Sequence, residues 1–337
     1  MRELPPRNST GAHPDADLDR RSSHVAPTKA PRIVGLGVAC LDHLFVAPPV
    51  PPGHQTRVRD SATEGGGLVA TALVAAARLG ARAEIRTWIG DDPEGDLVLS
   101  GLEQEGIDAS GIVVVPGAVT AVSFIHVTEG TGERTIFHRR GPAPTKAQMD
   151  AASRIEGAYD AVLVDATWPK ASLALARNAR KAGVPVVADF CPQLALRALA
   201  GVVDALIVPR TCAEQLSPNS DWADRLGALR ELGPSLVVIT AGADGCYYLN
   251  HDRAEHFPAF RTEVTDTTGA GDVFHGAFAY GLAARLPLRE CVALASATAA
   301  LSCRALGGRR AIPTYQQVAQ FLREQTRSHE GSDCYLS

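Results

Sequence analysis

Short apolar runs alternate with amphipathic segments along most of the chain. The first run covers residues 33–39, and similar runs recur at 84–89, 161–164, 184–188, 205–208 and 236–240. Apolar runs of this length are typical of strands that are buried on both faces. Between them, segments such as 68–80 and 96–106 have a helical pattern and end at a glycine, as helices commonly do. The alternation predicts an α/β fold in which helices cover a mainly parallel sheet.

Two segments have a different period. Within 43–65 and 120–140, stretches such as Val122–Val127 and Thr135–Arg139 alternate apolar with polar residues. That is the period of strands with one face in water. We expect these segments to form a small β lid that projects from the main sheet.

The two ends of the chain differ from its middle. Residues 1–30 contain four prolines among Ser, Asp and Arg and almost no large apolar residues. Such a segment buries too little surface to offset its ordering entropy, so we expect a disordered extension. The folded domain is expected over 31–325, followed by a tail at 326–337.

Composition narrows the function classes. The 337 residues are 45% hydrophobic and 21% charged, with a net charge of −4, as in a globular protein that binds small molecules. The cationic residues are scattered, which argues against a nucleic-acid partner. No apolar run is long enough to span a membrane, and the polar N-terminus is unlike a signal peptide, so a cytoplasmic location is expected. The seven cysteines are odd in number and widely spaced, which predicts buried thiols and neither a disulfide framework nor a zinc site.

Residues 264–282 contain the chain's most informative motif, a glycine-rich turn that leads into an amphipathic helix. Gly269 and Gly271 let backbone N–H groups converge on an anion, and the start of the helix adds its dipole. Asp272 beside this cradle is either the N-cap of the helix or a general base that takes a hydroxyl proton during phosphoryl transfer. The flexible glycines on both sides of Ala270 favour the general base.

The run Asp266-Thr267-Thr268-Gly269-Ala270-Gly271-Asp272, followed by Gly276, resembles the C-terminal motif of the ribokinase-like, or PfkB, family of sugar and nucleoside kinases. The resemblance implies a ribokinase-like fold with a β lid, and ATP as phosphate donor. It also implies that Gly269, Ala270 and Gly271 form an anion hole and that Asp272 is the catalytic base. The resemblance covers about residues 31–325.

On the acceptor side there are five candidate residues, and the resemblance implies four of them, all except Arg139. Asp42 lies near the end of the first strand, where a matching Asp binds sugar hydroxyls, and its alternative role is that of an ordinary loop residue. Gly66 and Gly67 resemble the family's di-glycine motif, whose alternative is a flexible loop before a helix. Thr71 stands where the family has a sugar-binding Asn. Arg139, at the end of a lid strand, is either a solvated charge or a ligand for an anionic group on the sugar.

On the nucleotide side, Thr240, Gly242 and Gly245 resemble the segment that contacts ATP. A hairpin turn is the alternative. Gly308 lies in a stretch, 304–313, that resembles the loop closing over the purine.

Metal ligands are implied only by the resemblance. Family members place an Asn and a Glu, tied to phosphate and hydrated Mg²⁺, after the strand that precedes the nucleotide segment. The Asn is absent here, and Glu214 is the candidate acid. Asp266 and Thr268 match positions that hold a monovalent cation in several relatives, so a K⁺ requirement is a hypothesis.

The predicted function is ATP-dependent phosphorylation of a primary hydroxyl of a sugar. The segment 65–72, Phe274–Ala277 and the Cys303-Arg304 pair look most like the ketohexokinase and sulfofructose kinase branch, which favours a fructose-like ketose. Ribose, a nucleoside, sulfofructose and a non-catalytic sugar-binding regulator are the alternatives. The sequence argues against a dinucleotide-dependent oxidoreductase, because the third glycine of the dinucleotide-binding motif is missing after Gly35 and Gly37. It also contains no Walker motif, which argues against a Walker-type NTPase. A lid with an exposed apolar face also suits a homodimer.

Overall fold

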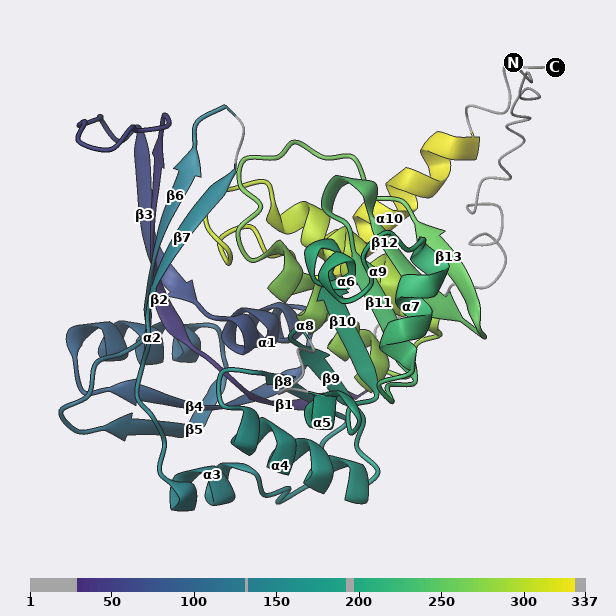
Figure 1. Ribbon diagram of the computed structural model, residues 1–337, viewed down its shortest axis with the longest axis horizontal. Coiled ribbons are helices and arrows are strands. Elements are labelled where there is room, and N and C mark those ends of the chain that lie inside the picture. The colour runs from purple at the N-terminus through teal and green to yellow at the C-terminus, as the bar shows by residue number, and fades with distance from the viewer. Residues whose placement is uncertain (1–28, 131–132, 192–196, 331–337) are drawn as a thin grey trace.

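The computed structural model describes residues 29–130, 133–191 and 197–330, and its core is one large, mostly parallel sheet (Figure 1). In the described residues the strand order is β13-β12-β11-β10-β9-β8-β1-β4-β5, parallel from β11 through β5 and antiparallel at β12 and β13. The strands are β1 (Arg32–Leu36), β4 (Arg82–Gly90), β5 (Asp108–Val115), β8 (Ala161–Asp165), β9 (Val186–Asp189), β10 (Ala205–Pro209), β11 (Leu236–Thr240), β12 (Cys246–Asn250) and β13 (Arg253–Phe257). The predicted α/β class is confirmed.

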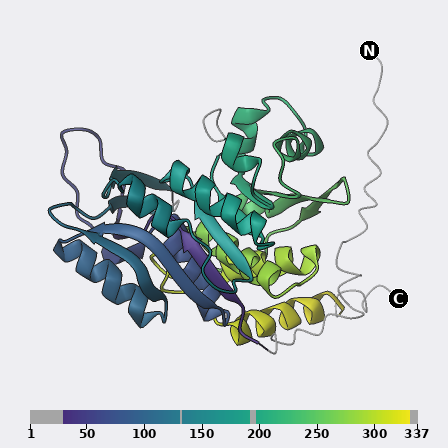
Figure 2. The ribbon, with the colours of Figure 1, turned by 90° about the horizontal axis from the view of Figure 1, so that it is seen from below.

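Helices cover both faces of this sheet (Figure 2). One face carries α1 (Leu68–Arg78), α2 (Pro93–Gln104), α8 (Ala270–Ala283), α9 (Leu288–Ser302) and α10 (Tyr315–Glu330). The other carries α3 (Lys146–Ala152), α4 (Pro169–Lys181), α5 (Arg197–Ala200), α6 (Arg210–Leu216) and α7 (Trp222–Arg230). In Figure 2 the yellow α10 lies across the sheet from the teal and green helices of the second layer.

The apolar strands explain this double layer. Along β10, Ile207 packs into the α1–α8 core while its neighbours Leu206 and Val208 pack on the opposite side. The same alternation occurs in β8, where Leu163 faces α8. Successive side chains of a strand point to opposite faces, so a strand that is apolar throughout needs helices on both.

The lid is a separate four-stranded sheet in the order β3-β2-β6-β7, seen at the upper left of Figure 1. Its strands are β2 (Cys40–Ala47), β3 (Asp60–Gly66), β6 (Val122–Thr128) and β7 (Arg134–Arg139). They fall largely within the two segments predicted from their alternating pattern. On the inner face, Leu44, Ile125 and Val127 bury against Leu306 of the C-terminal loop. The lid is therefore packed onto the main domain.

The structure differs from two expectations. Helix α10 continues to Glu330, beyond the expected domain end at residue 325. Cys191 and Cys212 form a disulfide, so the prediction of unpaired thiols is wrong for this pair. Among the described residues, the other cysteines, Cys40, Cys246, Cys291 and Cys303, are free and buried, as expected. The expected N-terminal extension lies almost wholly outside the described residues. Within those residues, no helix is both long and apolar enough to cross a bilayer.

Candidate active site

The glycine-rich turn forms the start of helix α8, and no side chain caps it. Gly269 is the N-cap residue, with a φ of 70°, a left-handed conformation that glycine adopts without strain. A Cβ placed on Gly269 would lie 2.9 Å from Cα of Gly308, whereas one on Gly271 would meet nothing within 4 Å. The first-turn amides of α8 therefore lack a side-chain acceptor, which makes this turn a suitable anion cradle.

Asp272 lies in the first turn of α8, three residues after the N-cap. The interpretation of Asp272 as the N-cap is therefore wrong. Burial raises the pKa of the Asp272 carboxyl well above its usual range, and the nearby charges of Asp189 and Asp42 raise it further. Arg134 and Arg309 act in the opposite direction. A carboxylate with a raised pKa and no capping bond is suited to accept a proton.

Two further carboxylates end neighbouring strands of the main sheet. Asp165 ends β8, and its oxygens accept the N–H groups of Val38, at 2.7 Å, and of Thr167, at 2.8 Å. Complete burial raises the pKa of Asp165 to about 6. Asp189 ends β9, and its Oδ2 lies 3.3 Å from Nδ1 of His275, one turn after Asp272 on α8. Sequence reasoning did not single out Asp165, Asp189 or His275, although both aspartates directly follow predicted buried strands.

Asp42 lies within lid strand β2 rather than in a loop, and it is only 7% exposed. Strand register places it in one row with Glu64 on β3, Ser123 on β6 and His138 on β7. Cys40 Sγ donates to Asp42 Oδ1 at 3.1 Å. Burial raises the pKa of Asp42, and hydrogen bonds from Cys40 and Ser123 lower it. The inner face of the lid thus presents a polar row beside its apolar cluster.

The di-glycine motif lies against Asp42. A Cβ on Gly66 would be 2.0 Å from the Asp42 carboxylate, and one on Gly67 would be 2.4 Å from the carbonyl oxygen of Val38. Gly67 also has a φ of 96° and is the N-cap of α1. Larger residues would collide with Asp42 at position 66 and with the backbone of Val38 at position 67, so close packing requires both glycines.

The structure gives Thr71 and Arg139 partners within the protein. Thr71 is 2% exposed, and its hydroxyl accepts a hydrogen bond from Arg309 Nε at 3.2 Å. Arg139 donates to the carbonyl of Thr120 and lies 3.7 Å from Asp92 and 3.6 Å from Glu94. Because its charge is balanced by these two carboxylates, the geometry does not favour Arg139 as a ligand for an anionic sugar.

The predicted nucleotide segment is the connection between β11 and β12. These strands pair antiparallel, and Gly242–Asp244 forms a single 3₁₀ turn between them, so the segment is a hairpin, and its contact with ATP stays a prediction. Thr240 ends β11 at the edge of the sheet where Asp165 and Asp189 also lie. Gly245 has a φ of 88°, and a Cβ there would lie 2.0 Å from the carbonyl oxygen of Phe257. A hairpin at this edge remains available to a nucleotide.

The candidate metal ligands have partners too. Asp266 Oδ1 accepts the N–H and hydroxyl of Thr268, at 2.9 and 2.8 Å, and its Oδ2 accepts Gly307 N–H at 2.9 Å. Glu214, on α6, lies 3.9 Å from Arg225 on α7. In the described residues there is no cluster of three or more His, Cys, Asp or Glu side chains that suits a metal ion. Asp266 therefore stabilises the glycine-rich turn through its hydrogen bonds from Thr268 and Gly307.

Residues 34–315 match the family model described as "pfkB family carbohydrate kinase". The chain belongs to this family. As a pfkB family member it is an ATP-dependent carbohydrate kinase, as the resemblance of its C-terminal motif implied.

Individual pfkB relatives match between 76% and 87% of the chain. The ribokinase of Haemophilus influenzae is 29% identical over 297 residues, which are 85% of this chain and 97% of the relative. The aminoimidazole riboside kinase of Salmonella typhimurium is 29% identical over 76% of this chain and 87% of its own length. The crystal structure of ribokinase from Thermotoga maritima superposes with a TM-score of 0.73 at 27% identity, covering 87% of this chain and 99% of that chain. The ribokinase-like fold is thereby established.

Proposed function

We propose that the protein transfers the γ-phosphate of ATP to a primary hydroxyl of ribose or of a riboside. The observation that carries this proposal is the position of Asp272, which lies in the first helical turn beside uncapped amides and does not serve as the N-cap. The names of the relatives support a ribose-type acceptor, because they are a ribokinase and an aminoimidazole riboside kinase. They favour it over the fructose-like ketose expected from the motifs. The assignment to the ketohexokinase and sulfofructose kinase branch stays a prediction.

We assign a residue or a group of residues to each step of the proposed mechanism. Asp272 takes the proton from the acceptor hydroxyl as that oxygen attacks phosphorus. The amides of Gly269, Ala270 and Gly271 stabilise charge on the transferred group. Asp42 orients the sugar through its hydroxyls, and the adjacent Gly66 and Gly67 let the chain approach it closely.

The nucleotide lies, in this proposal, between the β11–β12 hairpin and the C-terminal loop. Thr240, Gly242 and Gly245 line it on one side, and Thr268 and Gly308 on the other. Contact between Gly308 and Gly269 supports this arrangement, because it brings the purine-side loop against the anion cradle.

Metal ions enter the proposal in a limited way. Mg²⁺ supplies charge neutralisation on phosphate oxygens, and it is commonly held by the nucleotide with few protein ligands. The partners of Asp266 and Glu214 do not form a site for Mg²⁺ within the protein, so no step depends on one. A K⁺ ion near Asp266 and Thr268 stays a proposal, and unchanged activity after exchange of K⁺ for a large organic cation would contradict it.

The test is a panel of acceptors. We expect ATP-dependent product with ribose or a riboside, less with fructose or sulfofructose, and almost none with the Asp272→Asn variant. If fructose were the best substrate of the panel, the acceptor would be a ketose, as the motifs predicted, and the ribose proposal would be wrong. Binding of sugars without any ATP turnover would contradict the assignment of Asp272 as base.

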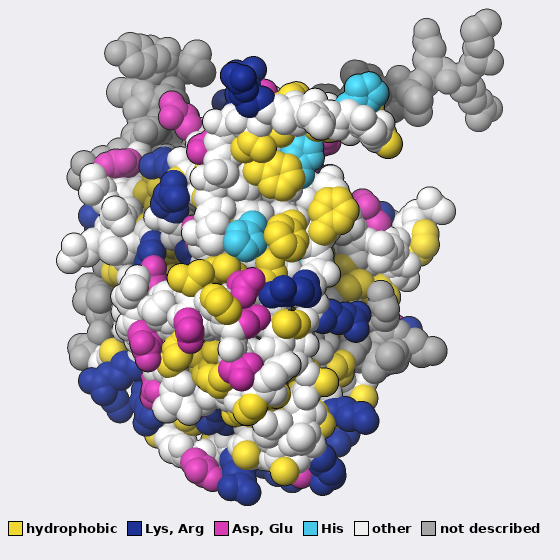
Figure 3. Space-filling view, turned by 90° about the vertical axis from the view of Figure 1, so that its left-hand side faces the viewer, with side chains coloured by type: hydrophobic (Ala, Val, Ile, Leu, Met, Phe, Trp, Pro, Cys, Tyr) yellow, Lys and Arg dark blue, Asp and Glu magenta, His cyan; other side chains and the backbone are white. Residues whose placement is uncertain are grey.

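We also propose that the outer face of the lid pairs with a second copy of the chain. Phe124 is 46% and Phe137 62% exposed there, and His43 stacks on Phe124 as His126 does on Phe45. Figure 3 shows hydrophobic and histidine side chains gathered on the upper part of this side of the molecule. An exposed cluster of aromatic residues commonly marks an interface. Light scattering that gives a monomer mass at micromolar concentrations would contradict it.

A further inference from the structure

The loop 307–309 lies between the donor half of the site, which is the anion cradle at Gly269–Gly271, and the acceptor half, which is Asp42 with the di-glycine motif. It contacts the donor half through its first two residues. Gly307 N–H donates to Asp266 Oδ2 at 2.9 Å, and Gly308 lies against Gly269 at the start of the anion cradle. Gly307 has a φ of 100° and a Cβ there would collide with Glu64. The loop is therefore fixed closely on the turn that precedes α8.

The same loop reaches the acceptor half through Arg309. Its backbone N–H donates to Glu64 Oε1 at 3.2 Å, and its Nη2 donates to the carbonyl of Gly66 at 2.7 Å. Nε donates to the Thr71 hydroxyl at 3.2 Å. One residue thus contacts the lid strand β3, the di-glycine motif and helix α1.

The Arg309 side chain is unusual in its burial, because the residue is only 5% exposed. Among the described residues, no carboxylate oxygen lies within ion-pair distance of its guanidinium group. A buried cation costs free energy unless its hydrogen bonds are well satisfied, and burial lowers the pKa of Arg309 accordingly. Gly65 makes the space, since a Cβ there would lie 2.2 Å from Nη1. A planar fork of donors fixes both of its acceptors at a defined distance.

We propose that Arg309 is a positioning residue that holds the di-glycine motif and Thr71 at a fixed distance from the anion cradle. The inference rests on the proposed function, because it assigns the acceptor to the Asp42 side and ATP to the Gly269 side. Arg309 acts through Gly66 and Thr71 and contributes to transfer by keeping the attacking hydroxyl in line with the phosphate. Misplacement of reacting groups by about 1 Å costs on the order of a hundredfold in rate.

The matched control is an arginine outside this loop. Arg323 is exposed on α10, so Arg323→Gln removes the same charge from a position outside residues 304–313. We expect Arg309→Gln to lower kcat by about tenfold to a hundredfold while the KM for ATP stays unchanged, with Arg309→Lys intermediate because an ammonium group has no planar fork. Arg323→Gln should match the wild type.

A second readout separates positioning from mere structural support. If the acceptor hydroxyl is misplaced, water competes better, so the fraction of ATP hydrolysed without sugar phosphate should rise in Arg309→Gln. A lower melting temperature with normal kcat and normal coupling would overturn the inference. Gly65→Ala retains the arginine and displaces its Nη1, so it gives the same readout if Arg309→Gln does not fold. Wild-type coupling in Gly65→Ala would then count against the inference.

A third measurement does not depend on the identity of the sugar. With a non-hydrolysable ATP analogue, hydrogen exchange at residues 64–72 should slow in the wild type and in Arg323→Gln, but not in Arg309→Gln. No change at 64–72 in the wild type would overturn the inference. If the acceptor panel fails while this protection is seen, the proposed function is wrong and the positioning role of Arg309 stands.

Discussion

Arg134 Nη1, on lid strand β7, donates a 2.7 Å hydrogen bond to the carbonyl oxygen of Thr267, two residues before the N-cap of α8. The bond joins the lid directly to the turn that forms the anion cradle. The lid is therefore held closed at two places, by this bond and by the apolar cluster around Leu306. Closure matters because water competes with the sugar hydroxyl for the phosphate.

Removing this contact should loosen the lid. We expect Arg134→Gln to raise the KM for the sugar by about three- to tenfold, as loss of one partly exposed charge-assisted hydrogen bond implies. It should also raise the pKa of Asp272, which Arg134 lowers, and so move the acid limb of the kcat/KM profile to higher pH. Arg140→Gln, an exposed position just after the same strand, is the control.

Asp189 should have the opposite effect on the pH profile. Its charge is the largest influence on the pKa of Asp272 after burial, and it raises that pKa. Asp189→Asn removes the charge, so the acid limb of kcat/KM should move to lower pH. A limb that stays in place would mean that Asp272 does not set it. The comparison with Arg134→Gln makes the test independent of general loss of activity, because the two shifts have opposite signs.

Asp272→Asn should separate activity from stability. We expect kcat to fall by about 10²–10⁴, the usual contribution of a general base, with binding of ATP retained. The pKa of Asp272 is raised in the folded protein, so ionising it lowers the free energy of unfolding once the pH exceeds the ordinary Asp value of about 3.9. The inactive variant should therefore melt at a higher temperature than the wild type.

The pH dependence of that stabilisation checks its cause. The melting-temperature advantage of Asp272→Asn should be larger at about pH 8 than at about pH 5, because more of the wild-type carboxyl is ionised in the folded state at the higher pH. Scanning calorimetry at both values measures it. An advantage that is constant with pH would assign the effect to packing and not to charge.

The sequence allowed prediction of the parts that depend on local pattern. The apolar runs at 161–164, 205–208 and 236–240 each fall inside an observed strand, because a strand covered on both faces must be apolar throughout. The glycine-rich turn and Asp272 could also be predicted from local sequence. The glycines that allow a positive φ and the carboxylate beside them lie within a few residues of one another. Strand β5 was missed because it lies at the edge of the sheet, is half-exposed and has no clear period.

Contacts between distant segments could not be predicted in this way. Arg309 meets Gly66 and Thr71 across more than two hundred residues of chain, and nothing near Arg309 marks it as different from Arg310. Thr71 was expected to bind the sugar, which stays a prediction, and its hydrogen bond from Arg309 could not be read from the sequence. Asp165 and Asp189 were within reach of sequence reasoning, because both directly follow predicted buried strands whose carboxyl ends meet at one edge.

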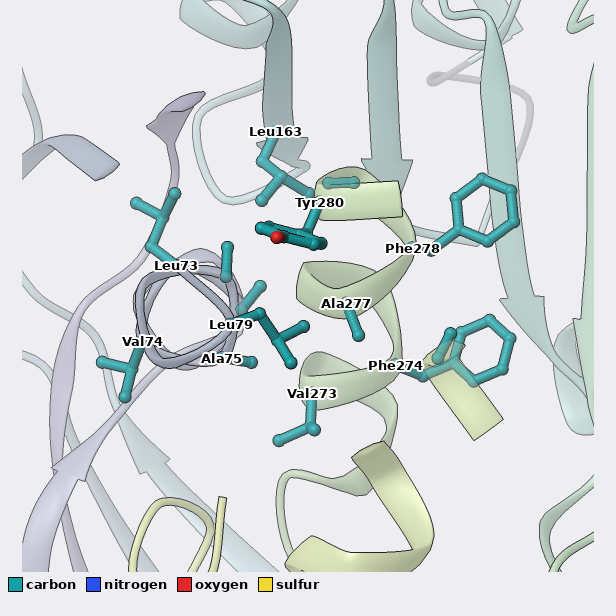
Figure 4. Packing of buried hydrophobic residues seen from close by; sticks show 14 of the residues in the cluster. Leu73, Val74, Ala75, Leu79, Leu163, Val273, Phe274, Ala277, Phe278 and Tyr280 are labelled. Carbon is teal, nitrogen blue, oxygen red and sulfur yellow. The ribbon is translucent and has the colours of Figure 1, made fainter. Parts of the chain in front are cut away.

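Gly276 tests the packing that places the catalytic turn. In Figure 4, Val273, Ala277 and Tyr280 of α8 point toward α1, while Phe274 and Phe278 point away from it. Gly276 lies on the line of closest approach, where a Cβ would be 1.9 Å from the carbonyl oxygen of Ala72 on α1. Backbone cannot move aside as a side chain can, so the two helices would have to separate.

We expect Gly276→Ala to lower the free energy of unfolding by about 1–3 kcal/mol, the usual cost of overpacking a core. Separation of α1 from α8 would also move the di-glycine motif relative to Asp272, so kcat should fall as well. Gly101→Ala is the matched control, because Gly101 also lies inside a helix, α2, and a Cβ there meets nothing within 4 Å. That change should stabilise the protein by about 0.5–1 kcal/mol through helix propensity alone. Equal effects of the two substitutions in urea unfolding would show that contact between α1 and α8 does not require glycine.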